Sequence, residues 1–345
     1  MMKRIDVTNA SLGPKWIRKL CNFLPRSHAY CLGDALASFI ARRRDLPLVK
    51  ALYGNMAVVH GIPEGDPRLE DDVRRLFRNM IRGYIDLFQA LKRGPEAVFV
   101  SCQFETSLLE AIQSCRETGQ GLVLAGAHSC SFDLLLLALT KHFPEVQALT
   151  KSSPKGSSVV MNEIRADFGI RVTPISVGAL REAIGRLKSG GVIVIAADVP
   201  VDSGAEMIFF RRKTRLPVGH ARLAMKTGAK MMVGTSIKLS EGHFQAIGVQ
   251  AHRPVTSGDR ERDVVRWAQH ALFLLERFIR HRPHEWFMPV SLWPARYTQA
   301  QFSRAYHRMS SIDHAPGFPM SKDDLQLGGL NIAGARRDEN DHPYC

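Results

Sequence analysis

Two apolar runs meet at His128-Ser129-Cys130-Ser131-Phe132-Asp133. The first, Gly121-Leu122-Val123-Leu124-Ala125-Gly126, has the length of a buried strand, and the second, Leu134-Leu135-Leu136-Leu137-Ala138-Leu139, is predicted to be helical. A strand that ends where a helix begins places the His and the Asp at the rim of an α/β sheet, where such folds usually bind ligands. The hexapeptide, called the His box below, therefore predicts both a fold class and the place of a site.

The chemistry of the pair follows from its side chains. His has an ordinary pKa near neutrality, so His128 can take a proton from a hydroxyl group. A carboxylate one helical turn away can accept the N–H of one ring nitrogen and leave the other nitrogen free as the base. We therefore predict His128 as a general base and Asp133 as the group that orients its ring, with the attacking hydroxyl or amine supplied by the substrate. The alternative is that Asp133 only favours the positive end of the helix dipole.

The one cysteine of the His box offers a second chemistry. Cys130 could act as a thiol nucleophile, although a cysteine in this setting is more often a small buried packing residue. The chain has six cysteines, scattered without a Cys-x-x-Cys pair, which fits a reducing compartment and no structural zinc. No metal site is expected.

Downstream of the His box, short apolar runs alternate with helical segments. We predict strands at residues 146–150, 171–175 and 192–197, separated by helices at residues 158–168 and 179–187. Such alternation implies crossover units and a largely parallel sheet flanked by helices. Residues 231–238 and 243–250 are predicted to form a hairpin at its edge. Amphipathic helices are expected at residues 69–92, 106–118 and 260–280.

Further candidate site residues lie after the strand at residues 192–197. Asp198 ends that strand as His128 ends the earlier one, although it could simply begin a turn with Pro200. The loop at residues 199–207 leads into Phe209-Phe210-Arg211-Arg212-Lys213-Thr214-Arg215, the densest mixture of aromatic and basic residues in the chain. Guanidinium groups bind phosphate through charge-assisted hydrogen bonds, so Arg211, Arg212 and Arg215 are candidates for substrate binding.

The charge of the chain points to an anionic partner. Its 345 residues include 47 Lys and Arg against 33 Asp and Glu, a net charge of +14. An anionic membrane surface is favoured over nucleic acid, because residues 14–44 form an amphipathic helical pattern and no nucleic-acid motif is visible. We predict no signal peptide and no spanning helix, since no window reaches the roughly 18 apolar residues that a span needs.

The His box, the strand at residues 192–197 and Phe209-Phe210-Arg211-Arg212-Lys213-Thr214-Arg215-Leu216-Pro217-Val218-Gly219 occur in that order. With Ala221-Arg222-Leu223-Ala224 and Thr227-Gly228-Ala229 they resemble the lysophospholipid and lipid A late acyltransferase family, over about residues 48–294. The resemblance implies a glycerolipid acyltransferase-like α/β domain, an HX4D mechanism with His128 and Asp133, and Asp198 near the active site. It also adds Arg165, on the helix before Gly169, to the candidate substrate pocket. One departure is Ser129-Cys130-Ser131-Phe132, where lipid A acyltransferases usually carry Gly-Asn-Trp, and this leaves the acceptor open.

The predicted function is transfer of a fatty acyl chain from acyl-CoA or acyl-carrier protein, as co-substrate, to a hydroxyl of a lipid or glycolipid, with no cofactor. Residues 1–62 are expected to be a membrane-associating helical segment, residues 63–296 the acyltransferase domain and residues 297–345 a poorly ordered tail. The expected location is peripheral, on the cytoplasmic face of the cell inner membrane. Two alternatives stay open: a non-catalytic adaptor for anionic lipids, and a hydrolase using Cys130 or Ser129. The absence of a Gly-x-Ser-x-Gly elbow counts against the hydrolase.

Overall fold

The centre of the fold is a seven-stranded sheet in the order β1-β9-β8-β2-β5-β3-β4. We describe a computed structural model, which covers residues 18–293 apart from residues 20, 22, 144 and 155. The strands are β1 (Cys102–Phe104), β2 (Leu122–Gly126), β3 (Val146–Thr150), β4 (Arg171–Pro174), β5 (Val192–Ala196), β8 (Lys230–Ser240) and β9 (His243–Gln250). β2 runs parallel to β5 and β8, and β3 runs parallel to β4 and β5, whereas β8 and β9 pair antiparallel. The predicted α/β fold with a largely parallel sheet is confirmed. The predicted hairpin is β8–β9, but it lies one strand in from the edge, because the short β1 pairs parallel with β9 on its outer side.

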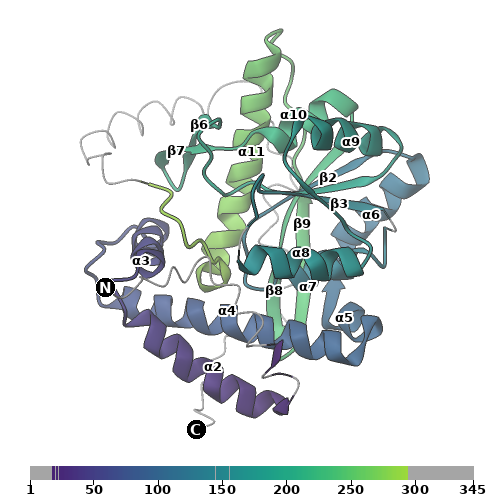
Figure 1. Ribbon diagram of the computed structural model, residues 1–345. Coiled ribbons are helices and arrows are strands. Elements are labelled where there is room, and N and C mark those ends of the chain that lie inside the picture. The colour runs from purple at the N-terminus through teal and green to yellow at the C-terminus, as the bar shows by residue number, and fades with distance from the viewer. Residues whose placement is uncertain (1–17, 20, 22, 144, 155, 294–345) are drawn as a thin grey trace.

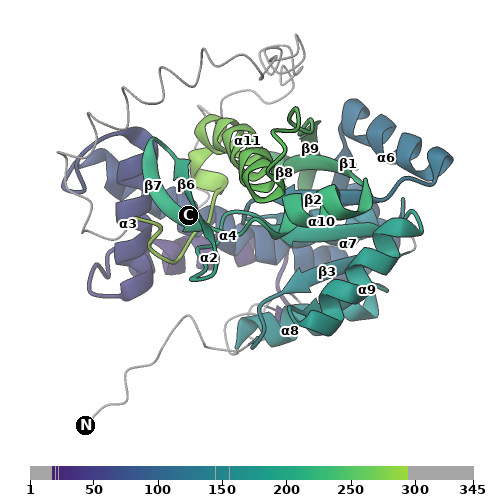
Figure 2. The ribbon, with the colours of Figure 1, turned by 90° about the horizontal axis from the view of Figure 1, so that it is seen from above.

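Helices cover both faces of this sheet, which explains the unbroken apolar strands. Val123, Val192 and Ile193 are fully buried, as strands covered on both sides should be. α7 (Phe132–Leu139) and α8 (Ser157–Asp167) lie on one face, and α9 (Val177–Lys188) and α10 (Gly219–Thr227) lie on the other (Figure 1). Figure 2 shows α9 and α10 from above, over the strands. The helical segments predicted between the strands are therefore crossover helices.

The N-terminal part of the described chain is helical, as predicted. Its helices are α2 (Arg26–Ala41), α3 (Pro47–His60), α4 (Arg68–Arg93), α5 (Pro95–Ser101) and α6 (Thr106–Thr118). α2 packs along α4, and the two run side by side at the bottom of Figure 1. α4 also approaches the His box closely at Gly83, where a Cβ atom would lie 2.4 Å from the carbonyl oxygen of Cys130. Only glycine fits there, so α4 supports the His box through direct backbone packing.

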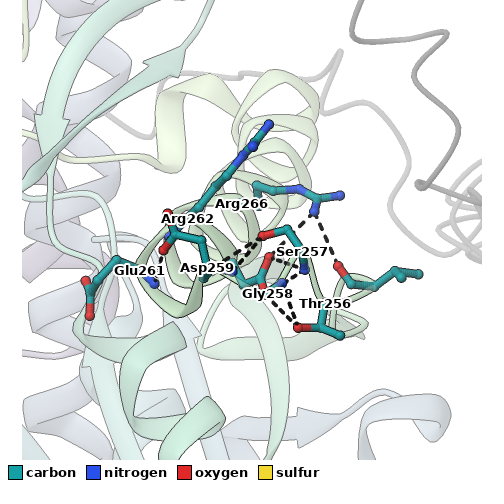
Figure 3. A network of polar contacts seen from close by, with 9 residues as sticks. Thr256, Ser257, Gly258, Asp259, Glu261, Arg262 and Arg266 are labelled. Atoms are coloured by element: carbon teal, nitrogen blue, oxygen red, sulfur yellow. Dashed lines mark hydrogen bonds and ion pairs between the residues drawn. The ribbon is translucent and has the colours of Figure 1, made fainter.

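α11 (Arg260–His281) spans the fold and delivers the chain back to the site. Its first turn is fixed by a polar network (Figure 3), in which the Asp259 carboxylate accepts hydrogen bonds from the backbone N–H groups of Glu261 and Arg262. This N-cap satisfies donors that have no partner within the helix. At its other end α11 leads into a short 3-10 helix, η2 (Pro283–Glu285), and then into Trp286.

The segment that follows β5 differs from its sequence interpretation. β6 (Ala205–Phe209) and β7 (Arg212–Leu216) form a separate two-stranded antiparallel sheet, where the sequence predicted a loop followed by a basic run. Buried residues alternate with exposed or partly exposed ones along both strands, with Phe209 and Leu216 fully buried. The turn residues Phe210 and Arg211 have φ of 50° and 60°, the backbone of a two-residue hairpin turn. Neither is a glycine, so the usual turn signal is missing.

The two ends of the chain are only partly described. Within residues 18–293, as described, none of the helices combines the length and apolarity needed to cross a membrane. The predicted tail at residues 297–345 and the first 17 residues of the predicted membrane-associating segment lie outside the described residues.

Candidate active site

His128 lies just beyond the carboxyl end of β2, with its side chain 40% exposed. Its ring Nδ1 is 2.7 Å from Asp198 Oδ1, and its backbone N–H donates to Asp198 Oδ2 at 2.8 Å. An ionised carboxylate can only accept hydrogen bonds, so Nδ1 carries the ring proton and donates it. Nε2 is then left unprotonated, as a general base requires.

Asp198, directly after β5 and Ala197, is completely buried. Besides the two bonds from His128, its Oδ2 accepts a hydrogen bond of 2.8 Å from Nε1 of Trp286. Burial alone raises the pKa of the carboxyl group, but the charge of His128 and these hydrogen bonds outweigh it, so the pKa is lowered. Asp198 therefore stays ionised beside the imidazole.

The pKa of His128 is shifted in the opposite direction by the same pair. Burial lowers it, and the charge and hydrogen bond of Asp198 outweigh burial, so the net pKa is raised above its ordinary value. The positive charges of Lys151 and Arg165 oppose this rise. The ring is thus a stronger base than a free histidine side chain, held in a positively charged setting.

The predicted hydrogen bond between the His128 ring and Asp133 is not the one that the structure shows, because Nδ1 of the ring is bonded to Asp198. A role of Asp133 in the reaction stays a prediction. Arg165 donates to Asp133 Oδ1 from Nε at 2.8 Å and from Nη2 at 2.6 Å, and it also donates to Asn162. The physical reason is that α7 begins at Phe132, so Asp133 lies in its first turn and its carboxylate meets the guanidinium of α8. Phe132 instead stacks on His128, with ring centroids 6.3 Å apart.

Lys151 is a site residue that the sequence interpretation missed. It is exposed and follows β3 directly, at the same edge of the sheet as His128 and Asp198. The rule that singled out those two residues, a polar residue at the carboxyl end of a parallel strand, would also have selected Lys151. Arg165, which was predicted, lies at this edge too and is 15% exposed.

The three predicted arginines of the basic run lie on the β6–β7 hairpin. Arg211 and Arg215 are exposed and Arg212 is partly exposed. Arg215 donates to the carbonyl oxygen of Asp202 at 3.1 Å. The hairpin reaches the site with its apolar side, because Phe209 and Phe210 pack on Trp286. The structure thus brings His128, Asp198, Asp133 and Arg165 together and sets these arginines on a neighbouring element.

The inner residues of the His box are held by neighbours other than His128. The hydroxyl groups of Ser129 and Ser131 each hydrogen-bond to that of Ser236, at 2.8 and 2.7 Å. Cys130 Sγ contacts the carbonyl oxygen of Leu76, and burial raises the pKa of its thiol well above the ordinary value. The described residues contain no group of three or more His, Cys, Asp or Glu side chains that could hold a metal ion.

Residues 14–294 match the model of the bacterial lipid A biosynthesis acyltransferase family. The chain belongs to this family. The predicted family and enzyme class are therefore confirmed, and the chain is an acyltransferase. Its sequence is 26% identical over 233 residues to the phosphatidylinositol mannoside acyltransferase of Mycolicibacterium smegmatis, covering 66% of this chain and 73% of that protein.

A second relative is the phosphatidylinositol mannoside acyltransferase of Mycobacterium tuberculosis strain H37Rv. It is 27% identical over 204 residues, which are 56% of this chain and 61% of that protein. The family model thus spans the whole α/β domain, whereas the identities to these acyltransferases are moderate and their matches shorter. They fix the reaction class of this family member and leave its substrates to be inferred from the site.

Proposed function

We propose that this acyltransferase moves a fatty acyl chain from an acyl thioester to a hydroxyl group of a lipid or glycolipid, with His128 as general base and Asp198 as its orienting partner. The observation that carries the mechanism is the hydrogen bond from His128 Nδ1 to the buried Asp198, which leaves Nε2 free on a side chain that is 40% exposed. The pair has the arrangement of base and orienting carboxylate found in catalytic triads, with the substrate hydroxyl in place of the serine.

The reaction can be written with all its atoms. The acceptor hydroxyl gives its proton to Nε2 of His128, and its oxygen attacks the thioester carbonyl carbon. The carbon–sulfur bond then breaks, and the leaving thiolate takes the proton from the imidazolium. The products are an acyl ester and a free thiol, so no cofactor takes part. Acyl-CoA and acyl-carrier protein both supply such a thioester.

The positive charges at the site suit an anionic substrate group. Lys151 and Arg165 are close enough to His128 for their charges to lower its pKa. A phosphate on the acceptor or on the donor would neutralise part of this charge. Arg211, Arg212 and Arg215 on the hairpin stay predicted contacts for the same kind of group. The relatives' names make a mannosylated phosphatidylinositol the first acceptor to test, ahead of lysophospholipids and lipid A precursors.

The geometry gives less support to the hydrolase alternative. In the described part of the chain, Ser129 and Ser131 are hydrogen-bonded to Ser236, and Cys130 is bonded to the carbonyl oxygen of Leu76. No nucleophile of the His box is therefore hydrogen-bonded to His128 there. A hydroxyl or thiol without a base beside it is a weak nucleophile.

Replacement of His128 by Ala tests the mechanism. With palmitoyl-CoA or palmitoyl-acyl-carrier protein as donor, the parent protein should release free thiol only when one of the acceptor lipids is present. His128→Ala should lower the rate by about 10³-fold, with an unchanged Tm as the control for folding. A His128→Ala protein that acylates at the parent rate would refute the mechanism, and a parent protein inactive with every pair would favour the adaptor.

The proposed membrane partner rests on the outer face of α2. Ala29, Gly33 and Ala37 of this helix are buried, whereas Leu32, Leu36 and Phe39 are 52%, 45% and 61% exposed. The helix ends next to Arg42, Arg43 and Arg44. Exposed apolar residues beside a cluster of positive charge suit the surface of an anionic bilayer. Binding there would place the enzyme beside a lipid acceptor, and its location on the cytoplasmic face stays a prediction.

Sedimentation with lipid vesicles tests this surface. The parent protein should sediment with phosphatidylglycerol vesicles and much less with phosphatidylcholine vesicles. The double variant Leu36→Glu and Phe39→Glu should weaken binding by about tenfold or more, since two apolar side chains are lost. Val100→Glu is the matched control, because Val100 is 56% exposed on α5 and outside this face. Equal sedimentation of the parent and the double variant would refute the assignment.

A further inference from the structure

Residues 285–287 are locked onto the His box by their backbone. Cys130 N–H donates to the carbonyl oxygen of Glu285 at 2.8 Å, and Phe287 N–H donates to that of His128 at 2.8 Å. Ser129 and Trp286 form the antiparallel bridge between these two bonds. The segment after α11 is therefore fixed against His128, the proposed general base, although the two are distant in the sequence.

The side chain of Trp286 points at the carboxylate behind His128. Its Nε1 donates to Asp198 Oδ2 at 2.8 Å, the oxygen that also accepts the backbone N–H of His128. Only Oδ1 is left for the imidazole. The indole is 2% exposed and packs against both Phe209 and Phe210 of the hairpin. Neither the carboxylate nor the indole reaches solvent, so no water can replace this bond without repacking.

We propose that Trp286 is a positioning residue for acyl transfer, whose indole N–H fixes the rotation of the Asp198 carboxylate so that Oδ1 faces Nδ1 of His128. The inference rests on the proposed function of His128 and Asp198. Without this donor, one oxygen of the buried Asp198 carboxylate loses a hydrogen-bond partner. The carboxylate can then rotate, so that Oδ1 no longer points steadily at Nδ1 of His128. The imidazole would then lose its fixed orientation, and small misplacements of a catalytic group cost rate rather than substrate affinity.

The same aromatic cluster contains a matched control. Trp293 stacks on Phe209 and meets Phe210 edge-on, with ring centroids 6.0 Å apart in both pairs. It is 8% exposed, and its Nε1 is buried with no hydrogen-bond partner among the described residues. Trp286→Phe and Trp293→Phe therefore remove an indole from one cluster, but only the first removes a donor to Asp198.

Steady-state kinetics of the two variants test the proposal, with palmitoyl-CoA and the acceptor lipid that the parent protein acylates. Trp286→Phe should lower kcat by about 10- to 100-fold with KM changed by less than about twofold, whereas Trp293→Phe should keep kcat within about threefold of the parent. The pH profile supplies a readout that loss of packing does not move. The Asp198 carboxylate, having lost a donor, attracts the imidazolium more strongly, so the acidic limb of kcat/KM moves to higher pH in Trp286→Phe only.

The proposal is overturned if Trp286→Phe matches Trp293→Phe in kcat and in the position of that limb. A His128→Ala protein that retains activity would instead overturn the proposed function itself, so the two failures are distinguishable.

A measurement on the parent protein covers the case in which Trp286→Phe fails to fold. In ¹⁵N spectra the indole N–H resonance of Trp286 should shift as His128 titrates and should stop doing so in His128→Ala, because the carboxylate couples the two groups. The resonance of Trp293 should not respond. Single replacements of the other tryptophans, Trp16, Trp267 and Trp293, assign the signals. A Trp286 resonance that ignores the titration would overturn the proposal.

Discussion

Asp198 and Asp133 lie at the same edge of the sheet, but they have different partners. Asp198 is fully buried and bonded to His128, a group that gains and loses a proton near neutral pH. Asp133 is 15% exposed and bonded to Arg165, a group that is always charged. A carboxylate beside a titrating ring can serve catalysis, whereas one beside a guanidinium serves mainly to hold it. Asp133, which is closer to His128 in the sequence, is the carboxylate bonded to a guanidinium.

The strand register explains why Asp198, and not Asp133, lies beside the His128 ring. Gly126 at the end of β2 is paired with Ala196 at the end of β5. His128 and Asp198 each lie two residues further along their chains, so neighbouring parallel strands bring them to the same place. Asp133 is instead carried away on α7 toward α8. Proximity across a sheet ladder therefore outweighs proximity along the chain.

The largest expected difference between the two carboxylates is in activity. Asp198→Asn should lower kcat/KM by about 10³- to 10⁴-fold, because an amide at this place favours the wrong tautomer of His128. Asp133→Asn should lower it by about tenfold, through a loosened Arg165 and the His box next to it. Both values come from the acylation assay with the parent protein as reference.

Thermal unfolding separates a catalytic effect from a folding defect in these variants. Each Asn variant should unfold cooperatively, and the comparison is made only below the lower of the two Tm values. A larger loss of activity in Asp133→Asn than in Asp198→Asn would reverse the assignment and restore the HX4D carboxylate as the partner of the ring.

The sequence predicted the fold well because the fold depends on local patterns. The apolar runs of β2, β3 and β5 and the periodicity of α4 and α11 needed no knowledge of the partner element. The site needed more. That β5 lies beside β2, with β3 on its far side, is a property of strand order. No residue near His128 encodes it, so Asp198 could be proposed as a strand-end residue but not as the partner of the ring.

Contacts from distant or irregular segments were the hardest to predict. Trp286 reaches Asp198 only because α11 spans the fold and η2 turns the chain back. The β6–β7 hairpin was missed because its turn is Phe210-Arg211, without the Asn or Gly that usually marks positive φ. In both cases contacts with distant parts of the chain stabilise the local structure, so the local sequence carries no signal for it.

The smallest expected difference is in the pKa of His128. Asp198 raises this pKa, so Asp198→Asn should lower it, because burial and the neighbouring positive charges then act without an opposing carboxylate. Arg165 lowers the same pKa, and Asp133→Asn leaves the charge of Arg165 uncompensated, so the pKa of His128 should also fall, but by less than in Asp198→Asn, because Arg165 acts on the ring more weakly than Asp198. NMR titration of the His128 ring, assigned with His128→Ala, measures both. Equal shifts in the two variants would mean that the carboxylates act on the ring alike, which the 2.7 Å bond to Asp198 argues against.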